Sequence, residues 1–228
     1  MDPLDNIIWK ALTTRQAQFA ESFGTARRFV HEVGPLAAFE QCGDEGYESL
    51  ANLVNDKATV GLFLNDAYEP RPGWEFVAGA PLLQMICENG AKTPHKNGHP
   101  KIETLGDKDS PEMIELTTLT KPGPFGPRTH ELGYYVGIRD GGKLVAMAGE
   151  RLKAAGHTEV SAVCTHPDHL GKGYAALLIS EVMRAIRERA ETPFLHVRAH
   201  NTRAIAVYER LGFRIRWQGH VAVLRKTK

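Results

Sequence analysis

The chain has 228 residues, 42% hydrophobic and 24% charged, which is the composition of an ordinary globular protein. Its 28 basic and 27 acidic residues give a net charge of +1, so the bulk charge offers no case for binding DNA or RNA. No stretch approaches the ~18 consecutive apolar residues of a membrane span, and no signal peptide is recognisable. We therefore expect a cytoplasmic protein with no nucleic-acid or membrane partner.

The first ninety residues read as helices followed by strands. Apolar residues at helical spacing predict a helix over residues 6–23, with Asn6 as its cap, and a second helix over 47–54. Branched and aromatic residues predict strands over 59–64 and 74–87.

The middle of the chain is rich in turn residues. Residues 88–113 are crowded with Gly, Pro, Asn, Lys and Asp, which indicates a linker or a surface loop. Residues 114–120 fit either a strand or a short helix, and the prolines and glycines of 121–133 predict an extended loop. Residues 134–152 form two apolar runs separated by Asp-Gly-Gly at 140–142, which predicts a β-hairpin.

The last third alternates strands and helices. The elements are expected in the order strand 159–167, helix 173–190, strand 194–199 and helix 202–211. Asn201 or Thr202 is the expected cap of the last helix. Residues 213–226 read as a hairpin turning near Gly219, and 220–226 as a strand able to pair at a sheet edge. This order predicts a mixed α/β fold with helices packed on a central sheet.

Cysteine and histidine spacing gives no metal site. The three cysteines are Cys42, Cys87 and Cys164. Their odd number and wide spacing favour a reducing compartment. The closely spaced histidines are His95 and His99, and then His157, His166 and His169. Because no acidic or cysteine ligands stand at matching positions, we expect no bound metal.

Two glycines flank Lys172 where the loop 166–173 becomes a helix. A helix N-terminus presents unpaired N–H groups and a positive dipole end, and glycines let phosphate oxygens approach the backbone. Gly-x-Gly also serves plain tight turns, so the loop alone leaves both readings open. Neither GxxxxGK[ST] nor GxGxxG is present, which argues against a P-loop or a Rossmann site.

Two motifs in this region resemble those of the GNAT superfamily of acyl-CoA-dependent N-acetyltransferases. The phosphate motif [RQ]-x-x-G-x-[GA] is met by Gly173 and Ala175, whereas Leu170 replaces the usual Arg or Gln. The second motif is complete as Asn201, Ala204, Tyr208, Gly212 and Phe213. The resemblance covers about residues 114–224 and is closest to the glycine N-acyltransferase-like branch. It implies the acyl-CoA N-acyltransferase fold, with a mainly antiparallel central sheet flanked by helices.

The resemblance also implies where acetyl-CoA binds. The pantetheine arm is expected along the strand residues Val163, Cys164 and Thr165. The pyrophosphate is expected on the backbone N–H groups of Leu170, Gly171, Lys172, Gly173, Tyr174 and Ala175. Asn201 is a candidate to bind the coenzyme, to cap its helix, or both. Lys172 either offsets phosphate charge or is a solvated surface lysine.

The same resemblance suggests the catalytic groups. Tyr208 is the candidate general acid that protonates the departing thiolate, with a half-buried aromatic as the alternative reading. Glu159 is the candidate base. Strand alternation would place it on one face with Ser161 and Val163, unless the irregularity common in this strand of the family breaks the alternation. Partial burial is expected to raise its pKa. Glu150 on the neighbouring strand is its rival, either as the base or as a ligand for the ammonium group of the substrate. An acyl-enzyme on Cys164 is disfavoured, because direct transfer is the usual route in this family.

These residues predict an acyltransferase that moves an acetyl group from acetyl-CoA to a primary amine of a small molecule. The alternative is a catalytically silent acyl-CoA-binding sensor or interaction module. Arg128 or His130 in the 121–133 loop could hold a substrate carboxylate. We expect a catalytic domain over 106–228 and an N-terminal region over 1–105. The hypothesis for the N-terminal region is a degenerate half of the same type that shapes the acceptor site. The protein is expected to be a monomer or a homodimer.

Overall fold

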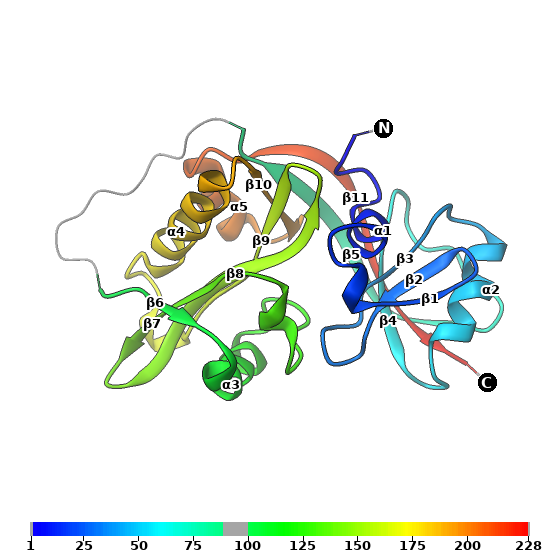
Figure 1. The fold of residues 1–228 in the computed structure, drawn as a ribbon, viewed down its shortest axis with the longest axis horizontal. Coiled ribbons are helices and arrows are strands. Elements are labelled where there is room, and N and C mark those ends of the chain that lie inside the picture. Colours follow the sequence, from blue (N-terminus) through cyan, green and yellow to red (C-terminus); the bar gives the residue numbers. More distant parts are fainter. Residues whose placement is uncertain (1, 89–99, 228) are drawn as a thin grey trace.

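The computed structural model describes residues 2–88 and 100–227. The helices longer than one turn are α1 (Ile7–Thr13), α2 (Asp44–Leu53), α3 (Ser110–Thr120), α4 (Tyr174–Glu188) and α5 (Thr202–Arg210). The strands are β1 (Ala20–Phe23), β2 (Ala26–Phe29), β3 (Ala37–Phe39), β4 (Thr59–Leu64), β5 (Trp74–Ile86), β6 (Glu103–Leu105), β7 (Tyr135–Asp140), β8 (Lys143–Ala154), β9 (His157–Thr165), β10 (Thr192–Arg198) and β11 (Arg214–Lys226). Figure 1 shows their arrangement.

Eight of these strands form one sheet in the order β4-β11-β5-β10-β9-β8-β7-β6, and β1-β2-β3 form a smaller sheet. β9 and β10 are parallel, whereas the other neighbouring pairs in the large sheet are antiparallel. The predicted mixed α/β fold with a mainly antiparallel sheet is therefore confirmed. The hairpin at Asp140–Lys143 is confirmed as well, with Gly141 and Gly142 at positive φ.

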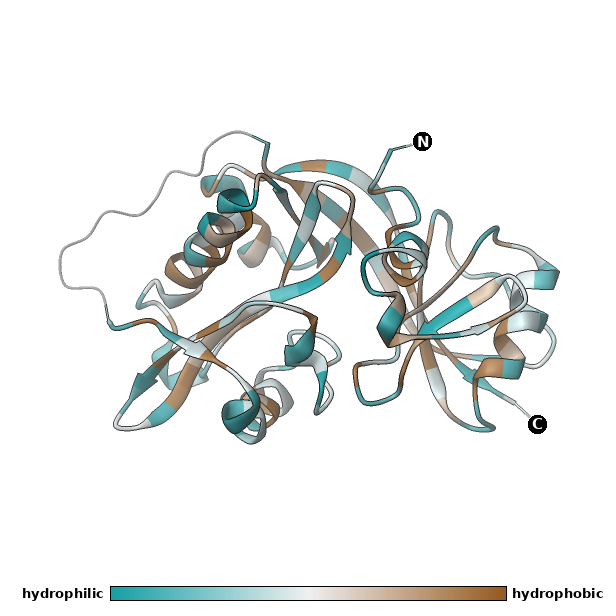
Figure 2. Ribbon diagram, in the orientation of Figure 1, coloured by the Kyte–Doolittle hydropathy of each residue, from teal (hydrophilic) through white to brown (hydrophobic). Residues whose placement is uncertain are grey.

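Helices cover both faces of the large sheet. On one face, α4 packs through Leu178, Val182 and Ile186, and α5 through Tyr208 and the Leu211 that follows it. On the other face, α3 covers β7 and β8, and α1 packs near Phe194 of β10. Figure 2 shows hydrophobic residues alternating with polar ones along α4, as expected for a helix with one buried side.

β5 and β11 form a long antiparallel pair that joins the two halves of the chain. The end of β5, Leu82–Ile86, lies between β10 and β11 of the C-terminal half. The end of β11 pairs in turn with β4 of the N-terminal half, from His220 to Arg225. Each half thus contributes one long strand to the other. The division of domains at residue 105 stays a prediction, and the main sheet runs across it.

The N-terminal helix is shorter than predicted. α1 ends at Thr13, where the hydroxyl of Thr13 donates to the Trp9 carbonyl, and such side-chain bonds compete with helix continuation. Ala20–Phe23 pair with β2 instead. Asn6 has a positive φ of 47° and makes no side-chain cap bond, because its amide donates to the Phe39 carbonyl at 2.7 Å.

The predicted C-terminal hairpin and edge are wrong. β11 is one strand without a turn, and it lies between β4 and β5 rather than at an edge. Gly219 is required there by crowding, since a Cβ would lie 2.1 Å from the Trp217 ring and 2.4 Å from the Leu64 carbonyl.

Two predictions for the middle of the chain are resolved in part. The predicted linker 88–113 contains β6 and the start of α3 in its described part, and residues 89–99 lie outside the described residues. Residues 114–120 belong to α3, which settles the choice between strand and helix in favour of helix.

Because β5 fills the position between β10 and β11, removing residues 1–105 should leave the C-terminal half without a central strand. We expect the 106–228 fragment to lack cooperative thermal unfolding by circular dichroism, and co-expression with residues 1–105 to restore it. A fragment that unfolds cooperatively alone and retains full activity would contradict this role of β5.

Candidate active site

β9 and β10 separate soon after they begin to pair. Their pairing is limited to three rungs, ending at Glu159–Phe194, although β9 continues to Thr165 and β10 to Arg198. β9 stays bonded to β8 on its other side as far as Thr165. Beyond Glu159, among the described residues, no strand pairs with the edge of β9 that faces β10. The two strands therefore diverge into a gap lined by backbone N–H and C=O groups, which require partners when they are buried.

A bulge lies within the diverging part of β9. Ala162 has a positive φ of 52°, and the register with β8 shifts between Ser161 and Cys164. Val160 and Val163 pack on the α4 side, whereas Cys164 packs on the α3 side. Glu159 meets His196, which lies on the face opposite Leu195 and Val197. The predicted common face for Glu159, Ser161 and Val163 is therefore wrong, because the extra residue reverses the alternation.

The loop that follows β9 leads into α4 through two left-handed glycines. Gly171 and Gly173 have φ of 80° and 81°, and a Cβ on either would meet nothing within 4 Å. No side chain caps α4, and its first turn, described in full, holds no acidic residue. The N–H group of Leu170 is already bonded to the Pro167 carbonyl at 3.2 Å. The remaining N–H groups at the start of α4 present a positive, uncapped helix end.

Lys172 and the nearby histidines make local contacts. The Nζ of Lys172 lies 3.1 Å from Nδ1 of His169 and 5.9 Å from the centre of the Tyr174 ring. Within residues 2–88 and 100–227, no three His, Cys, Asp or Glu side chains are placed to hold a metal ion. His95 and His99 lie outside the described residues.

α5 brings Tyr208 to the same apolar cluster as Val163 and Tyr174. Tyr208 is 9% exposed, and its hydroxyl has no hydrogen-bond partner among the described residues. Burial raises its pKa to about 12, so the phenol is protonated at neutral pH. Asn201 caps α5, accepting from the N–H of Ala204 at 3.2 Å, as predicted.

Glu159 occupies the last rung before the strands separate, and it is 0% exposed. The Arg151 guanidinium donates to both of its oxygens, at 2.7 and 2.8 Å, and Nδ1 of His196 lies 2.7 Å away. Burial opposes ionisation, but Arg151 and His196 outweigh it and lower the pKa of Glu159 to about 2. The expectation of a raised pKa is therefore wrong. The role of Glu159 as a base stays a prediction.

Sequence reasoning missed Arg151 and His196. Each is a polar residue within an apolar strand, and that pattern is a usable signal, since a buried charge needs a partner. That Glu159 is the shared partner could not be predicted, because Arg151 and His196 lie 8 and 37 positions from it along the chain.

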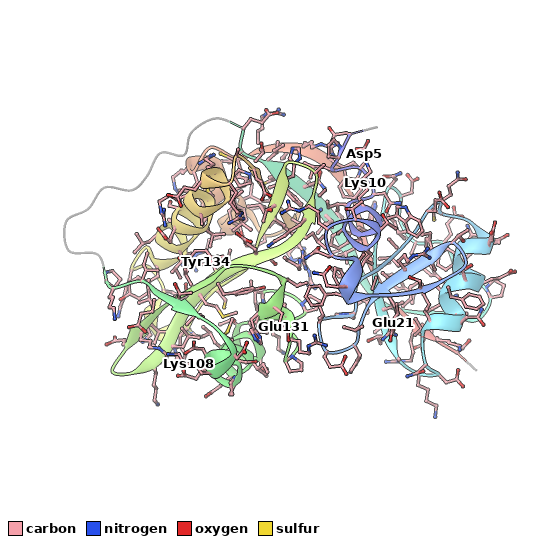
Figure 3. All side chains as sticks on the ribbon, in the orientation of Figure 1. Asp5, Lys10, Glu21, Lys108, Glu131 and Tyr134 are labelled. Carbon is pink, nitrogen blue, oxygen red and sulfur yellow. The ribbon has the colours of Figure 1, made fainter. Side chains whose placement is uncertain are left out.

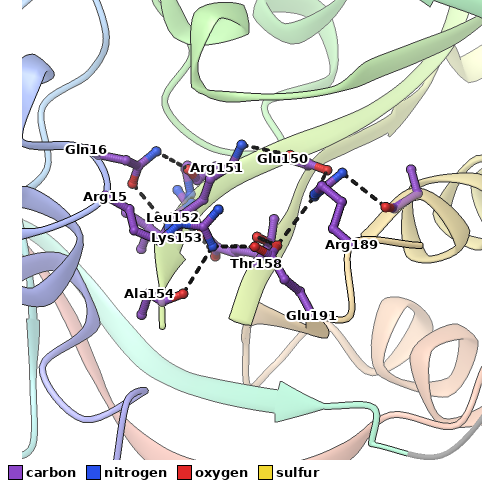
Figure 4. Close-up of polar contacts among 12 residues, drawn as sticks. Arg15, Gln16, Glu150, Arg151, Leu152, Lys153, Ala154, Thr158, Arg189 and Glu191 are labelled. Atoms are coloured by element: carbon purple, nitrogen blue, oxygen red, sulfur yellow. Dashed lines mark hydrogen bonds and ion pairs between the residues drawn. The ribbon is translucent and has the colours of Figure 1, made fainter. Parts of the chain in front are cut away.

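Glu150 also forms ion pairs. It is buried and lies 2.9 Å from Lys153 and 2.6 Å from Arg189. Figure 4 shows these contacts beside those of Gln16, which bonds the backbone of Arg151 and Lys153 at 2.7 and 3.1 Å. This network fastens the N-terminal region to β8.

Cys164 has the properties of a buried thiol. It lies in the apolar cluster under α3, and burial raises its pKa to about 11. A neutral thiol is a weak nucleophile, which agrees with the expectation against an acyl-enzyme.

The segment 121–133 touches the N-terminal region. The Thr129 hydroxyl donates to the Val33 carbonyl at 2.6 Å, and the N–H of Arg128 donates to the Glu32 carbonyl at 3.0 Å. The Arg128 guanidinium donates to both carboxylate oxygens of Glu131, at 2.7 and 2.8 Å, and Nε2 of His130 lies 2.8 Å from Oδ1 of Asp107. Figure 3 shows Glu131 between α3 and the N-terminal region. The segment 121–133, predicted to be an extended loop, contains a short 3₁₀ helix over Thr129–Leu132.

Comparison with known proteins identifies the family. The family model FR47-like protein matches residues 135–221. A GNAT-family structure from Novosphingobium aromaticivorans DSM 12444 is 37% identical, with a TM-score of 0.91 and 100% of both chains covered. The chain belongs to the GNAT family. Its GNAT fold supports acyltransferase activity in general. No protein in the curated set matches it.

More distant GNAT structures share the fold. A GCN5-related N-acetyltransferase from Kribbella flavida is 18% identical, with a TM-score of 0.67, covering 100% of this chain and 97% of its own. A GCN5-related N-acetyltransferase-like protein from Streptococcus suis is 14% identical, with a TM-score of 0.57, covering 99% and 94%. In the described part of this GNAT chain, no helix is long and apolar enough to cross a membrane.

Replacing Glu159 with glutamine should leave Arg151 as a buried cation without its counter-charge. We expect the free energy of unfolding at pH 7 to fall by roughly 3–5 kcal/mol. The folded-state pKa of Glu159, about 2, lies below its ordinary value of 4.5, so its contribution is complete above that value and is lost as the pH falls toward 2. Urea titrations of both proteins should therefore give a constant difference from pH 7 to 5 that narrows below pH 4.5.

Glu131→Gln is the matched control, because Glu131 also pairs bidentately with an arginine but is partly exposed. Its cost should be about 0–1 kcal/mol. Equal costs for the two substitutions would contradict the importance of burial at Glu159.

Proposed function

We propose that this protein transfers an acetyl group from acetyl-CoA to a primary amine of a small molecule by direct attack. The observation that carries the proposal is the open edge of β9, which leads through the glycine-containing loop 166–173 to the uncapped start of α4. An extended arm with amide groups can pair with a free strand edge. A diphosphate can rest on a helix N-terminus. Acetyl-CoA carries both groups in that order.

In this proposal Val163, Cys164 and Thr165 bind the pantetheine arm through their backbone. The glycine-flanked turn at 171–173 and the first N–H groups of α4 bind the diphosphate. Lys172 adds a positive charge beside it, and Asn201 borders the arm from α5. At the β9 bulge, where Ala162 has a φ of 52°, a backbone N–H directed into the gap would stabilise the oxyanion of the tetrahedral intermediate.

The chemistry forms a C–N bond and breaks a C–S bond. A neutral amine attacks the thioester carbonyl, and its excess proton leaves to solvent. The Tyr208 phenol, protonated at neutral pH, donates a proton to the departing thiolate. A carboxylate with a pKa of about 2 is a poor acceptor for an ammonium proton, which argues against Glu159 as the base. Glu150 is also a poor candidate, because one of its oxygens contacts Lys153 and the other contacts Arg189.

The identity of the acceptor rests on the surfaces around the gap. The segment 121–133 and the N-terminal loop at 32–34 contact each other. Both line a small pocket together with Arg151, the partner of Glu159, so both halves would shape the acceptor site. Three expectations stay predictions: the closer likeness to the glycine N-acyltransferase-like branch, the monomeric or homodimeric state, and the cytoplasmic location.

Gly173→Ala tests the diphosphate site. The left-handed backbone and the added methyl group should together weaken acetyl-CoA binding at least tenfold by isothermal titration calorimetry. Gly142→Ala is the control, because Gly142 has a φ of 85° with open space around it but lies in the β7–β8 turn. Equal weakening in both variants would show that strain, and not blocked access, is responsible.

Tyr208→Phe tests the general acid. We expect kcat to fall about 100-fold with KM for acetyl-CoA unchanged, measured as CoA release over a panel of amines. Tyr134→Phe is the control, since Tyr134 packs against the same cluster and its hydroxyl donates to Glu181. If both variants release CoA at the wild-type rate, the acid assignment fails. If the chain binds acetyl-CoA but turns over no amine, the silent sensor becomes the better reading.

A further inference from the structure

An open cavity of about 340 Å³ lies where β5 and β11 extend past the end of β10. Gly79–Pro81 and Phe76 of β5 line it together with His220–Ala222 of β11, and the β4–β5 connection contributes Ala67, Tyr68 and Pro70. β5 pairs with β10 only from Leu82 onward, so this part of its edge is exposed. The volume is within the range of small-molecule sites.

Two stacked aromatic rings form the wall. Tyr68 and Phe76 lie with their centroids 5.7 Å apart and their planes at 9°. Phe76 is 52% exposed, which is unusual for a large apolar side chain in a folded protein. Gly79 makes this possible, because a Cβ there would lie 2.8 Å from the Phe76 ring. The chain therefore presents a flat aromatic surface over a shallow floor.

The lining is apolar except for His220 and the Tyr68 hydroxyl, and it holds no charged residue. The hydroxyl accepts from the N–H of Arg71 at 3.0 Å. Nδ1 of His220 is buried and has no hydrogen-bond partner among the described residues. Such a site suits a planar aromatic group and excludes an ammonium, which would lose its hydration without a counter-charge.

In the large sheet, one strand, β10, separates the β5 part of the cavity lining from the proposed coenzyme site. The carbonyl of Pro81, a lining residue, accepts from the N–H of Ala199 at 2.9 Å, in the turn that carries Asn201. At about 4.8 Å between neighbouring strands, the β9–β10 gap lies roughly 10 Å away across β10. An aromatic ring held in the cavity could therefore carry an amine on a short aliphatic chain toward the gap.

We propose that the cavity lined by Tyr68, Phe76 and His220 binds the aromatic ring of the acceptor, so that the substrate is an arylalkyl primary amine. This assignment rests on the proposed acetyl transfer. The ring stacks on the Tyr68–Phe76 pair, and the amine stays outside the apolar lining, where it faces the thioester.

The test compares 2-phenylethylamine with 2-cyclohexylethylamine, which differ in aromaticity but not in chain length. Wild-type kcat/KM should favour the aromatic amine about fivefold or more. Tyr68→Ala should abolish this preference through KM, with the affinity for acetyl-CoA unchanged. Phe23→Ala is the control, since Phe23 is a comparably exposed aromatic on β1 that does not line the cavity. A preference that is absent in the wild type, or that survives Tyr68→Ala, would overturn the assignment.

Direct binding separates this inference from the proposed function. Saturation-transfer NMR of 2-phenylethylamine, recorded with the protein alone and in the presence of CoA, should show contact in the wild type that is lost in Tyr68→Ala. Acetyl-CoA binding without such contact would reject the aromatic site and leave the proposed transfer standing. Contact that depends on Tyr68 in a protein that does not bind acetyl-CoA would keep the site and reject the transfer.

Discussion

The carboxylate of Glu159 holds three strands together at the rung where the sheet divides. It accepts from Arg151 and from the N–H of Leu152 on β8, and it contacts His196 on β10. The pairing of β9 with β10 ends at the same residue. With its charge balanced by hydrogen bonds, such a buried network is rigid. It fixes the point at which the gap begins, and the bulge at Ala162 and the start of α4 are positioned from there.

Both halves of the chain are needed to build the surroundings of this gap. β5 supports β10 from the side away from the gap, although it is encoded before residue 90. The segment 121–133 is held by carbonyls of the N-terminal loop. The aromatic cavity likewise combines the β4–β5 connection with β11. The N-terminal region is therefore integral to the proposed site.

Local signals in the sequence predicted local features well. The Asp-Gly-Gly turn, the amphipathic α4, the strand β4 and the Asn201 cap all follow from short-range chemistry, and the structure confirms them. Predictions of secondary structure failed where contacts between residues far apart in the sequence determine the local conformation. Gly219 reads as a turn residue, yet it is extended because the Trp217 ring and a neighbouring strand lie against it.

The candidate site shows the same limit. Its glycine loop and Tyr208 could be named from motifs. The pKa of Glu159 could not be predicted, because its sign depends on Arg151 and His196 from other strands. The stacked pair of Tyr68 and Phe76 was not foreseen, since each residue alone looks like an ordinary turn or strand aromatic.

The exchange of β5 and β11 has a consequence for how the protein is made. β11 spans Arg214–Lys226 and supplies the partner of β4, so the N-terminal half lacks a strand until the ribosome has released the chain as far as residue 226. β5 must wait in the same way for β10 and β11. Nascent-chain folding should therefore be late and concerted, and chaperones that shield unpaired strands should matter more here than for a domain that closes on itself.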